Sequence, residues 1–247
     1  MRVDSVITMV VVRSARIRAA SISGRRLLRR LVKYAAMIRV GRKSFKKYSS
    51  FTMIPRLQYL GNLDLADRVR NVQGCIVECG TWRGGMIAGI AQSLGPEREY
   101  VLFDSFEGLP RAEDIDGLAA QAWQADITSP SYYNNCTAER NQAEQAMALA
   151  HVARPEIVAG WFNDTVPAWA LEGRQIALLR LDGDWYESTL VCLRNLFPLV
   201  VPGGLIVLDD YFVWEGCTRA VHQYLSEAQR PESIRTTKAG VPYIEKR

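Results

Sequence analysis

The sequence predicts an α/β fold in which helices cover both faces of a mostly parallel sheet. Short apolar runs alternate with longer segments whose apolar residues recur at helical spacing. Several of the short runs end in acidic or glycine-bearing turns, the place where such sheets bind ligands. With 247 residues, of which 48% are hydrophobic, the chain has globular proportions and can bury a full core.

Residues 1–50 form a basic leader, and we expect residues 51–247 to form a single domain. The leader has 14 Lys and Arg against one acid, a net charge of +13, whereas the rest has 17 against 25, a net charge of −8. Within it, residues 25–38 predict a basic amphipathic helix. This helix suits an anionic membrane surface or a polyanionic partner, but packing on its own domain or on a second copy is the stronger interpretation. A transit peptide has a similar composition, so the compartment stays open.

The remaining composition excludes several classes of protein. Five Cys show no framework of close pairs, which favours reduced thiols inside a cell. The uncharged apolar stretch of residues 6–12 is far shorter than the roughly 20 residues of a membrane span. We therefore expect a cytoplasmic protein that is peripheral at the membrane if the leader binds there. We do not expect it to bind nucleic acid.

Helix and strand patterns alternate from residue 57 onward. Residues 57–72 carry apolar side chains at helical spacing, and the apolar run of residues 75–79 predicts a buried strand that ends in a glycine-bearing turn. A second helix follows from residue 86, and a second strand at residues 100–103 is closed by Asp104.

The second half continues the alternation after a polar, Pro-containing stretch at residues 107–135, which we interpret as an excursion or lid. The expected elements that follow are an Ala-rich helix at 138–150, strands at 155–159, 176–181 and 205–208, a helix at 217–229 and a closing strand at 241–245.

Carboxylates end nearly every predicted strand. Because the carboxyl ends of parallel strands meet at one edge of a sheet, these side chains should converge there. They would repel one another unless cations or hydroxyl donors lay among them. The residues are Glu78, Asp104, Asp182, Asp184, Asp209 and Asp210.

The first of these turns, residues 78–85, predicts a cofactor site. Its spacing is not that of a dinucleotide-binding loop, and Glu78 before the first glycine would oppose a pyrophosphate. An acid there suits a cofactor with a positive charge. Asp104, at the next strand end, is placed to accept hydrogen bonds from two ribose hydroxyls. Together these features indicate S-adenosylmethionine.

The acidic pairs at residues 182–184 and 209–210 predict a metal site, since hard oxygen ligands from neighbouring strand ends suit Mg²⁺. His151 and His222 lie elsewhere, which argues against a His-rich zinc site. We expect His222 to be a surface or packing residue.

Five motifs also carry a family resemblance. They are Glu-Cys-Gly-Thr-Trp-Arg-Gly-Gly at 78–85, Asp-Ser-Phe-Glu-Gly-Leu-Pro at 104–110, Gly-Trp-Phe-Asn-Asp-Thr at 160–165, Leu-Asp-Gly-Asp-Trp-Tyr-Glu-Ser-Thr at 181–189, and Pro-Gly-Gly through Asp-Asp-Tyr at 202–211. In this order, over about residues 52–245, the chain resembles the macrocin O-methyltransferase family. Its members are metal-dependent enzymes that methylate deoxysugar hydroxyls of macrolide and aminocoumarin natural products.

The resemblance implies a Rossmann-like class I methyltransferase fold, S-adenosylmethionine, Mg²⁺, a role in antibiotic biosynthesis and often a homodimer. It implies Asp182, Asp209 and Asp210 as metal ligands and Asp184 as the general base. The cofactor residues that follow from the motifs are Glu78, Gly80, Thr81, Gly84, Asp104, Ser105, Gly160, Trp161, Phe162 and Asp182.

The expected reaction is methyl transfer to a sugar hydroxyl. Coordination to Mg²⁺ would lower the pKa of that hydroxyl, and Asp184 would take its proton. Four aromatic residues are candidates for a platform under the acceptor, although ordinary packing explains them equally well: Trp185, Tyr186, Tyr211 and Trp214.

Two other functions stay open. A metal-dependent glycosyltransferase would use Asp182 and Asp184, but it would not explain the loop at Glu78 or the second acidic pair. A noncatalytic membrane-associated protein would explain the leader and not the acidic strand ends. The acceptor itself, whether a small glycoside, a lipid-linked sugar or a polysaccharide end, is not specified.

Overall fold

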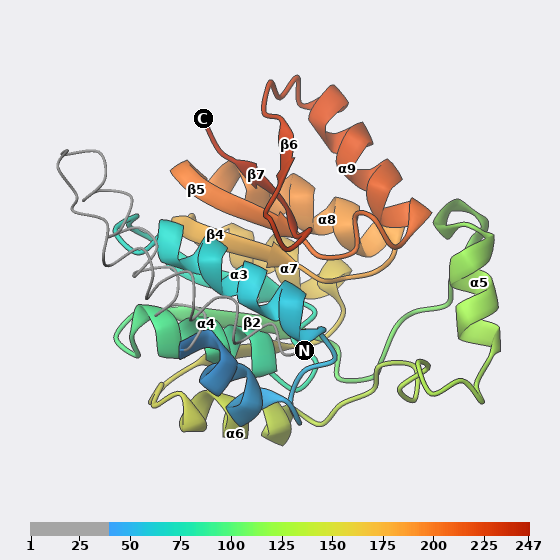
Figure 1. The fold of residues 1–247 in the computed structure, drawn as a ribbon. Helices are drawn as coiled ribbons and strands as arrows, with labels where there is room; N and C mark the ends of the chain where they lie inside the picture. Colours follow the sequence, from blue (N-terminus) through green and yellow to red (C-terminus); the bar gives the residue numbers. More distant parts are fainter. Residues whose placement is uncertain (1–39) are drawn as a thin grey trace, which may run out of the picture. The chain divides into compact units, whose positions relative to one another are not determined.

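The computed structural model describes residues 40–247, in which a seven-stranded sheet lies between two layers of helices (Figure 1). The strand order is β3-β2-β1-β4-β5-β7-β6. The first five strands are parallel, and β7 and β6 add to the edge in antiparallel pairings. The strands are β1 (Cys75–Cys79), β2 (Tyr100–Asp104), β3 (Glu156–Ala159), β4 (Ile176–Leu181), β5 (Val200–Leu208), β6 (Ile234–Thr236) and β7 (Pro242–Glu245).

Helices α3 (Arg56–Arg68), α4 (Gly85–Leu94) and α6 (Arg140–Leu149) cover one face of the sheet. Helices α7 (Phe162–Ala170), α8 (Tyr186–Leu196) and α9 (Glu215–Glu227) cover the other. Side chains alternate between the two faces along each strand, so neighbours in β1 enter different cores. This is the α/β fold that the alternating pattern predicts.

Most predicted strands are present, and the exceptions have local causes. β5 begins at Val200, earlier than the expected residue 205. The sequence pattern missed its first half because that half contains Pro202 and two glycines, with Pro202 and Gly203 exposed. β6 has three residues at the sheet edge, with two of them exposed, so no apolar alternation announces it. The stretch at 107–135, expected as an excursion or lid, contains the 3₁₀ helix η1 (Asp114–Asp116) and the helix α5 (Leu118–Ala125).

One compact unit of the chain comprises residues 41–247, so it starts before the domain boundary expected at residue 51. The helix of residues 40–48 buries Tyr48 completely, and Ser44 Oγ lies 3.0 Å from the hydroxyl of Tyr59 in α3. Composition assigns these residues to the leader because the same helix exposes four basic side chains, but its apolar side belongs to the core. The predicted amphipathic helix at 25–38 lies outside the described residues.

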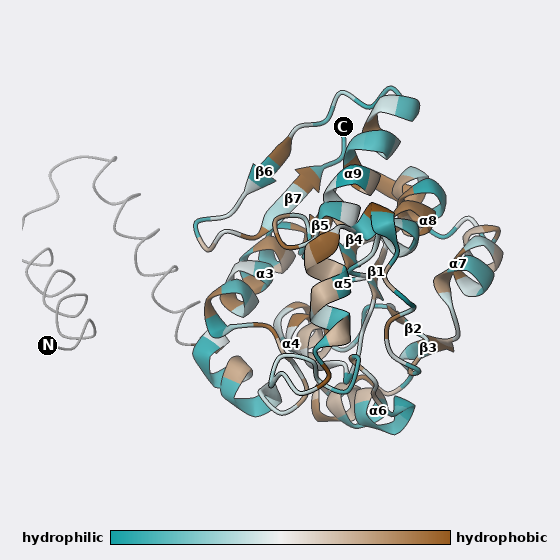
Figure 2. Ribbon diagram, turned by 90° about the vertical axis from the view of Figure 1, so that its right-hand side faces the viewer, coloured by the Kyte–Doolittle hydropathy of each residue, from teal (hydrophilic) through white to brown (hydrophobic). Residues whose placement is uncertain are grey.

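The five cysteines are all free, as their spacing predicts. Within residues 40–247, none of the helices has both the length and the apolar character that crossing a bilayer requires. The segment with η1 and α5 stands apart from the helix layers in Figure 1. In Figure 2, α5 lies in front of β1 and β4. Trp123 of α5 packs against Trp185, which follows β4, and against Trp214, which follows β5.

Candidate active site

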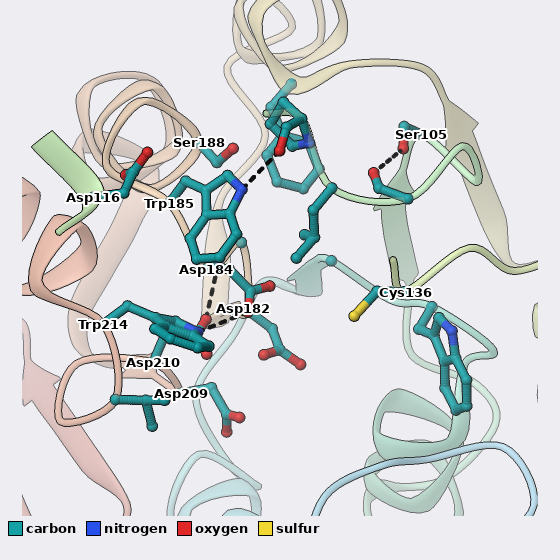
Figure 3. Close-up of a pocket in the computed structure, with 18 of the residues that line it drawn as sticks. Ser105, Asp116, Cys136, Asp182, Asp184, Trp185, Ser188, Asp209, Asp210 and Trp214 are labelled. Atoms are coloured by element: carbon teal, nitrogen blue, oxygen red, sulfur yellow. Dashed lines mark hydrogen bonds between the residues drawn. The ribbon is translucent and has the colours of Figure 1, made fainter. Parts of the chain in front are cut away.

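The carboxyl ends of β1, β2, β4 and β5 meet where the strand order changes direction, between β1 and β4. Backbone hydrogen bonds of 2.9 Å join the turns there, from the N–H of Asp182 to the carbonyl of Cys79 and from the N–H of Asp209 to the carbonyl of Leu181. Carboxylate oxygens of Asp182, Asp209 and Asp210 lie within 4.8 Å of one another (Figure 3). The predicted metal ligands therefore form one cluster of hard oxygen donors, which fits a Mg²⁺-type ion.

Arg180 is the counter-ion of this cluster, and the sequence analysis missed it. It is 1% exposed, and its Nη1 lies 3.1 Å from Glu78 Oε1 and 2.7 Å from Asp182 Oδ2. Its Nη2 lies 2.6 Å from Asp209 Oδ1 as an ion pair without hydrogen-bond alignment. Burial disfavours its charge, but the surrounding carboxylates hold the pKa of Arg180 well above its usual value. The available signal was a lone Arg inside an otherwise apolar strand.

Glu78 belongs to the same buried network and does not line the cavity described below. Its Oε2 accepts a hydrogen bond of 2.7 Å from the hydroxyl of Thr81. Burial raises the pKa of Glu78, while Arg180 and Thr81 oppose that rise. Thr81, Gly84 and Gly160, also expected at the cofactor site, likewise lie outside the described cavity lining.

Gly80 and Asp104 do face the cavity. Gly80 has a φ of +85°, and a Cβ there would overlap the carbonyl oxygen of Asp182, so this turn requires glycine. Asp104 accepts two backbone hydrogen bonds of 2.7 Å, from the N–H of Trp82 to Oδ2 and from that of Phe106 to Oδ1. These bonds fix both oxygens with capacity left for hydroxyl donors. Burial raises the pKa of Asp104 to about 6.

The cavity has a volume of about 490 Å³. Of the expected cofactor residues, those that line it are Gly80, Asp104, Ser105, Trp161, Phe162 and Asp182. Asp184, Asp209 and Asp210 line it as well. Eight carboxylate side chains reach its surface, whereas Arg111 is the one basic side chain among its described lining residues. The wall is therefore strongly acidic.

Asp184 occupies a left-handed backbone conformation, with a φ of +56°. Its N–H donates to Asp210 Oδ2 at 3.0 Å, and its Oδ1 accepts a 2.9 Å hydrogen bond from the indole N–H of Trp214. Burial raises the pKa of Asp184 to about 7, with the Trp214 hydrogen bond opposing and Asp209 adding to the rise. A carboxylate whose pKa is near neutral is suited to general-base chemistry.

Residues 107–136, which we term the flap, complete the cavity and are pinned at two places. Asp116 is buried, and its Oδ1 accepts a 2.8 Å hydrogen bond from the N–H of Tyr186 at the start of α8. The indole N–H of Trp185, just before α8, donates to the carbonyl of Pro110 in the flap at 2.9 Å. Within the flap, Asn135 donates through Nδ2 to the carbonyl of Leu109 and accepts through Oδ1 from Gln124 of α5. The flap is thus a fixed wall in this structure, and none of these contacts is visible in the sequence pattern.

The predicted aromatic platform is present in part. Trp185 and Trp214 line the cavity with ring centroids 5.3 Å apart, and Trp123 of α5 packs edge-on against both. Tyr186 and Tyr211 are outside the described lining. The hydroxyl of Tyr211 instead lies 2.9 Å from Nε2 of His222, an exposed residue as expected.

Comparison with known proteins identifies the family of this chain. A model of the macrocin O-methyltransferase family matches residues 27–243. The chain belongs to this family. The match includes the strand ends that hold the acidic cluster, so the family motifs and the cavity coincide.

Two relatives carry the names of O-methyltransferases. The chain is 34% identical over 177 residues to 8-demethyl-8-(2,3-dimethoxy-alpha-L-rhamnosyl)-tetracenomycin-C 4'-O-methyltransferase of Streptomyces olivaceus, covering 69% of this chain and 64% of that one. It is 31% identical over 208 residues to mycinamicin III 3''-O-methyltransferase of Micromonospora griseorubida, covering 78% of each. The chain thus spans slightly less than two thirds of the first relative.

Solved structures agree on the fold. The O-methyltransferase NovP superposes with a TM-score of 0.66 and 26% identity, covering 79% of this chain and 82% of that one. A calicheamicin methyltransferase superposes with a TM-score of 0.61 and 21% identity, covering 84% and 91%. This confirms the expected Rossmann-like class I methyltransferase fold.

Proposed function

We propose that this protein is an S-adenosylmethionine- and Mg²⁺-dependent O-methyltransferase that methylates a sugar hydroxyl of a glycosylated natural product or glycan. The observation that carries the proposal is the convergence of three metal-suited carboxylates and Asp184 on one cavity, in a chain of the macrocin O-methyltransferase family. The named relatives, which are sugar O-methyltransferases of antibiotic pathways, support the same reaction.

The cofactor would lie against Gly80 and Asp104. Gly80 presents the turn after β1 to the cavity, and the two fixed oxygens of Asp104 suit the ribose hydroxyls. Ser105 lies beside this position, and Trp161 and Phe162 supply apolar wall for an adenine ring. The acidic lining also favours a sulfonium over a pyrophosphate.

Asp182, Asp209 and Asp210 would hold the metal. Arg180 engages one oxygen of Asp182 and one of Asp209, so each keeps its other oxygen for coordination. A bound Mg²⁺ would supply Lewis-acid chemistry, lowering the pKa of an acceptor hydroxyl. Water and substrate oxygens would complete an octahedral shell that proteins rarely fill alone.

Asp184 would take the proton of the acceptor hydroxyl. Its carboxylate lines the cavity next to the predicted ligands, and its backbone is tied to one of them, Asp210. One oxygen is held by Trp214, which leaves the other to accept the proton.

The lining also indicates the chemical class of the acceptor. Trp123, Trp185 and Trp214 offer ring faces and edges to a sugar, which has apolar C–H surfaces. Eight carboxylates and one Arg would repel a diphosphate. These charges disfavour a nucleotide-sugar glycosyltransferase and favour an uncharged glycoside as acceptor.

We further propose a cytoplasmic homodimer that associates peripherally with anionic membranes through the basic leader. The family membership supports the dimer, and the leader charge of +13 supports the surface association. In the described part of the chain, the helix of residues 40–48 continues this basic character with exposed Arg42, Lys43, Lys46 and Lys47.

The test combines binding and turnover. Calorimetry should show binding of S-adenosylhomocysteine and no binding of a nucleoside diphosphate. Tritiated S-adenosylmethionine should then label p-nitrophenyl glycosides of 6-deoxyhexoses, α-L-rhamnoside among them, with Mg²⁺ and not with EDTA. Binding of the nucleoside diphosphate but not of S-adenosylhomocysteine would contradict the proposal and support a glycosyltransferase.

A further inference from the structure

Asp184 has its backbone and one carboxylate oxygen fixed by neighbours. The N–H donates to Asp210 Oδ2, and Oδ1 accepts from the indole N–H of Trp214 at 2.9 Å. Among the described residues, the indole N–H of Trp214 is the one side-chain donor that hydrogen-bonds to this carboxylate. The direction of the second oxygen, Oδ2, therefore depends on Trp214.

Trp214 is itself held in place from three sides. Its backbone N–H donates to the carbonyl of Asp210 at 3.0 Å, just before α9 begins. Its ring packs against Trp185, with centroids 5.3 Å apart, and against Trp123 of the flap, with centroids 6.0 Å apart. The ring cannot turn without disturbing the flap and the turn after β4. It is a rigid donor aimed at a single carboxylate oxygen, as Figure 3 shows.

We propose that Trp214 is the positioning residue of the base, holding Oδ1 of Asp184 so that Oδ2 faces the acceptor hydroxyl. The flap contributes through Trp123, whose ring packs edge-on against that of Trp214. This inference rests on the proposed function and assigns a role to a residue that itself need not touch the reacting atoms. The geometry predicts that loss of the indole N–H slows the proton transfer and spares cofactor binding.

The substitution Trp214→Phe removes the N–H and keeps an aromatic ring. With p-nitrophenyl α-L-rhamnoside, or the p-nitrophenyl 6-deoxyhexoside that the wild type methylates best, kcat should fall by about tenfold or more. KM for the glycoside and the affinity for S-adenosylhomocysteine should change by less than about threefold. An unchanged kcat in this variant would overturn the inference.

Trp169→Phe is the matched control. Trp169 also donates its indole N–H to a carboxylate, Glu156 Oε1, at 3.0 Å, and it lies outside the described cavity lining. Its replacement removes the same kind of bond between two residues that do not line the cavity, so kcat should stay at the wild-type value. An equal loss of kcat in both variants would mean that Trp214 acts through stability, which overturns the inference.

A double-mutant cycle with Asp184→Asn tests the route of the effect. If Trp214 acts through Asp184, adding Trp214→Phe to Asp184→Asn should lower single-turnover labelling by less than about twofold. The same factor in both backgrounds would overturn the inference, because Trp214 would then act independently of the base. Absence of methyl transfer by the wild type, with any of the glycosides, would instead contradict the proposed function.

Discussion

Arg180 and Glu78 lie side by side on β4 and β1, paired in the strand register, with Nη1 3.1 Å from Oε1 and each side chain 1% exposed. One guanidinium thereby joins the carboxylate beneath the glycine turn to the carboxylates proposed as metal ligands. Such a buried network is costly to break, because removal of one partner leaves uncompensated charge. Among the described residues, Arg180 is the cation that pairs both with Glu78 and with the proposed ligands Asp182 and Asp209.

Replacement of that cation should therefore be strongly destabilising. Arg180→Met should lower the free energy of unfolding by about 3 to 5 kcal/mol, measured by urea denaturation, since three carboxylates lose their counter-ion. Arg174→Met is the control, because Arg174 also contacts three acids, Glu99, Glu156 and Glu172, but with 28% of its side chain exposed. Its loss should be about 1 kcal/mol or less. Equal losses in the free energy of unfolding would show that the burial of Arg180 does not set the strength of its ion pairs.

Turnover should require a divalent cation. EDTA should abolish labelling and Mg²⁺ should restore it, while Asp209→Asn and Asp210→Asn should bind Mn²⁺ more weakly in an electron paramagnetic resonance titration. Asp182→Asn should raise the metal concentration that gives half-maximal activity. An exposed acid outside the cluster, Asp164 of α7, provides the control as Asp164→Asn. Full activity in metal-free buffer would rule out the proposed role.

Binding of S-adenosylhomocysteine should depend on Asp104 and on pH. Asp104→Ala should weaken binding by about 1.5 to 3 kcal/mol, the range for hydrogen bonds to a charged group. Burial raises the pKa of Asp104 to about 6. The carboxylate that accepts both hydroxyls predominates above that value, so affinity should fall as pH is lowered through about 6. Calorimetry from pH 5 to 8 checks this. If Asp104→Ala binds S-adenosylhomocysteine with the same affinity and pH dependence as the wild type, Asp104 does not bind the ribose.

Asp184→Asn should show whether Asp184 acts as the general base or as a metal ligand. The amide keeps size and hydrogen bonding but cannot take a proton, so kcat should fall by the roughly 10² to 10⁴ of a lost general base. Metal and cofactor affinities should change little. Recovery of activity with excess Mg²⁺ would identify Asp184 as a ligand instead.

Two truncations should separate the leader from the domain. Removing residues 1–39 should preserve S-adenosylhomocysteine binding and reduce sedimentation with anionic vesicles, an association that salt should weaken in the full chain. Removing residues 1–48 should also lower the melting temperature, because it deletes buried Tyr48 and the contact of Ser44 with Tyr59. Equal vesicle binding by the full chain and the shorter truncation would exclude the leader as the membrane-binding element.

Local pattern was enough to locate much of the sheet. β1 and β4 occupy the predicted residues because each is a short apolar run between breaking turns, and every residue of both is buried. β6 and the start of β5 escaped notice because an exposed edge strand and a strand with Pro-Gly-Gly carry no apolar pattern. The flap helices were missed because α5 buries only Ala120 against the rest of the fold, which leaves no apolar stripe to detect.

The sequence by itself determined the α/β class, the family motifs and the residue types at the strand ends, since these depend on neighbours within a few positions. Tertiary structure decided which of those side chains face the cavity and which partner holds each one. Arg180 meets Glu78 across 102 residues, Asp116 meets Tyr186 across 70, and Trp214 meets Asp184 across 30. Such contacts arise only when the sheet sets the register between strands and the flap folds back across their ends, and no local spacing encodes that geometry.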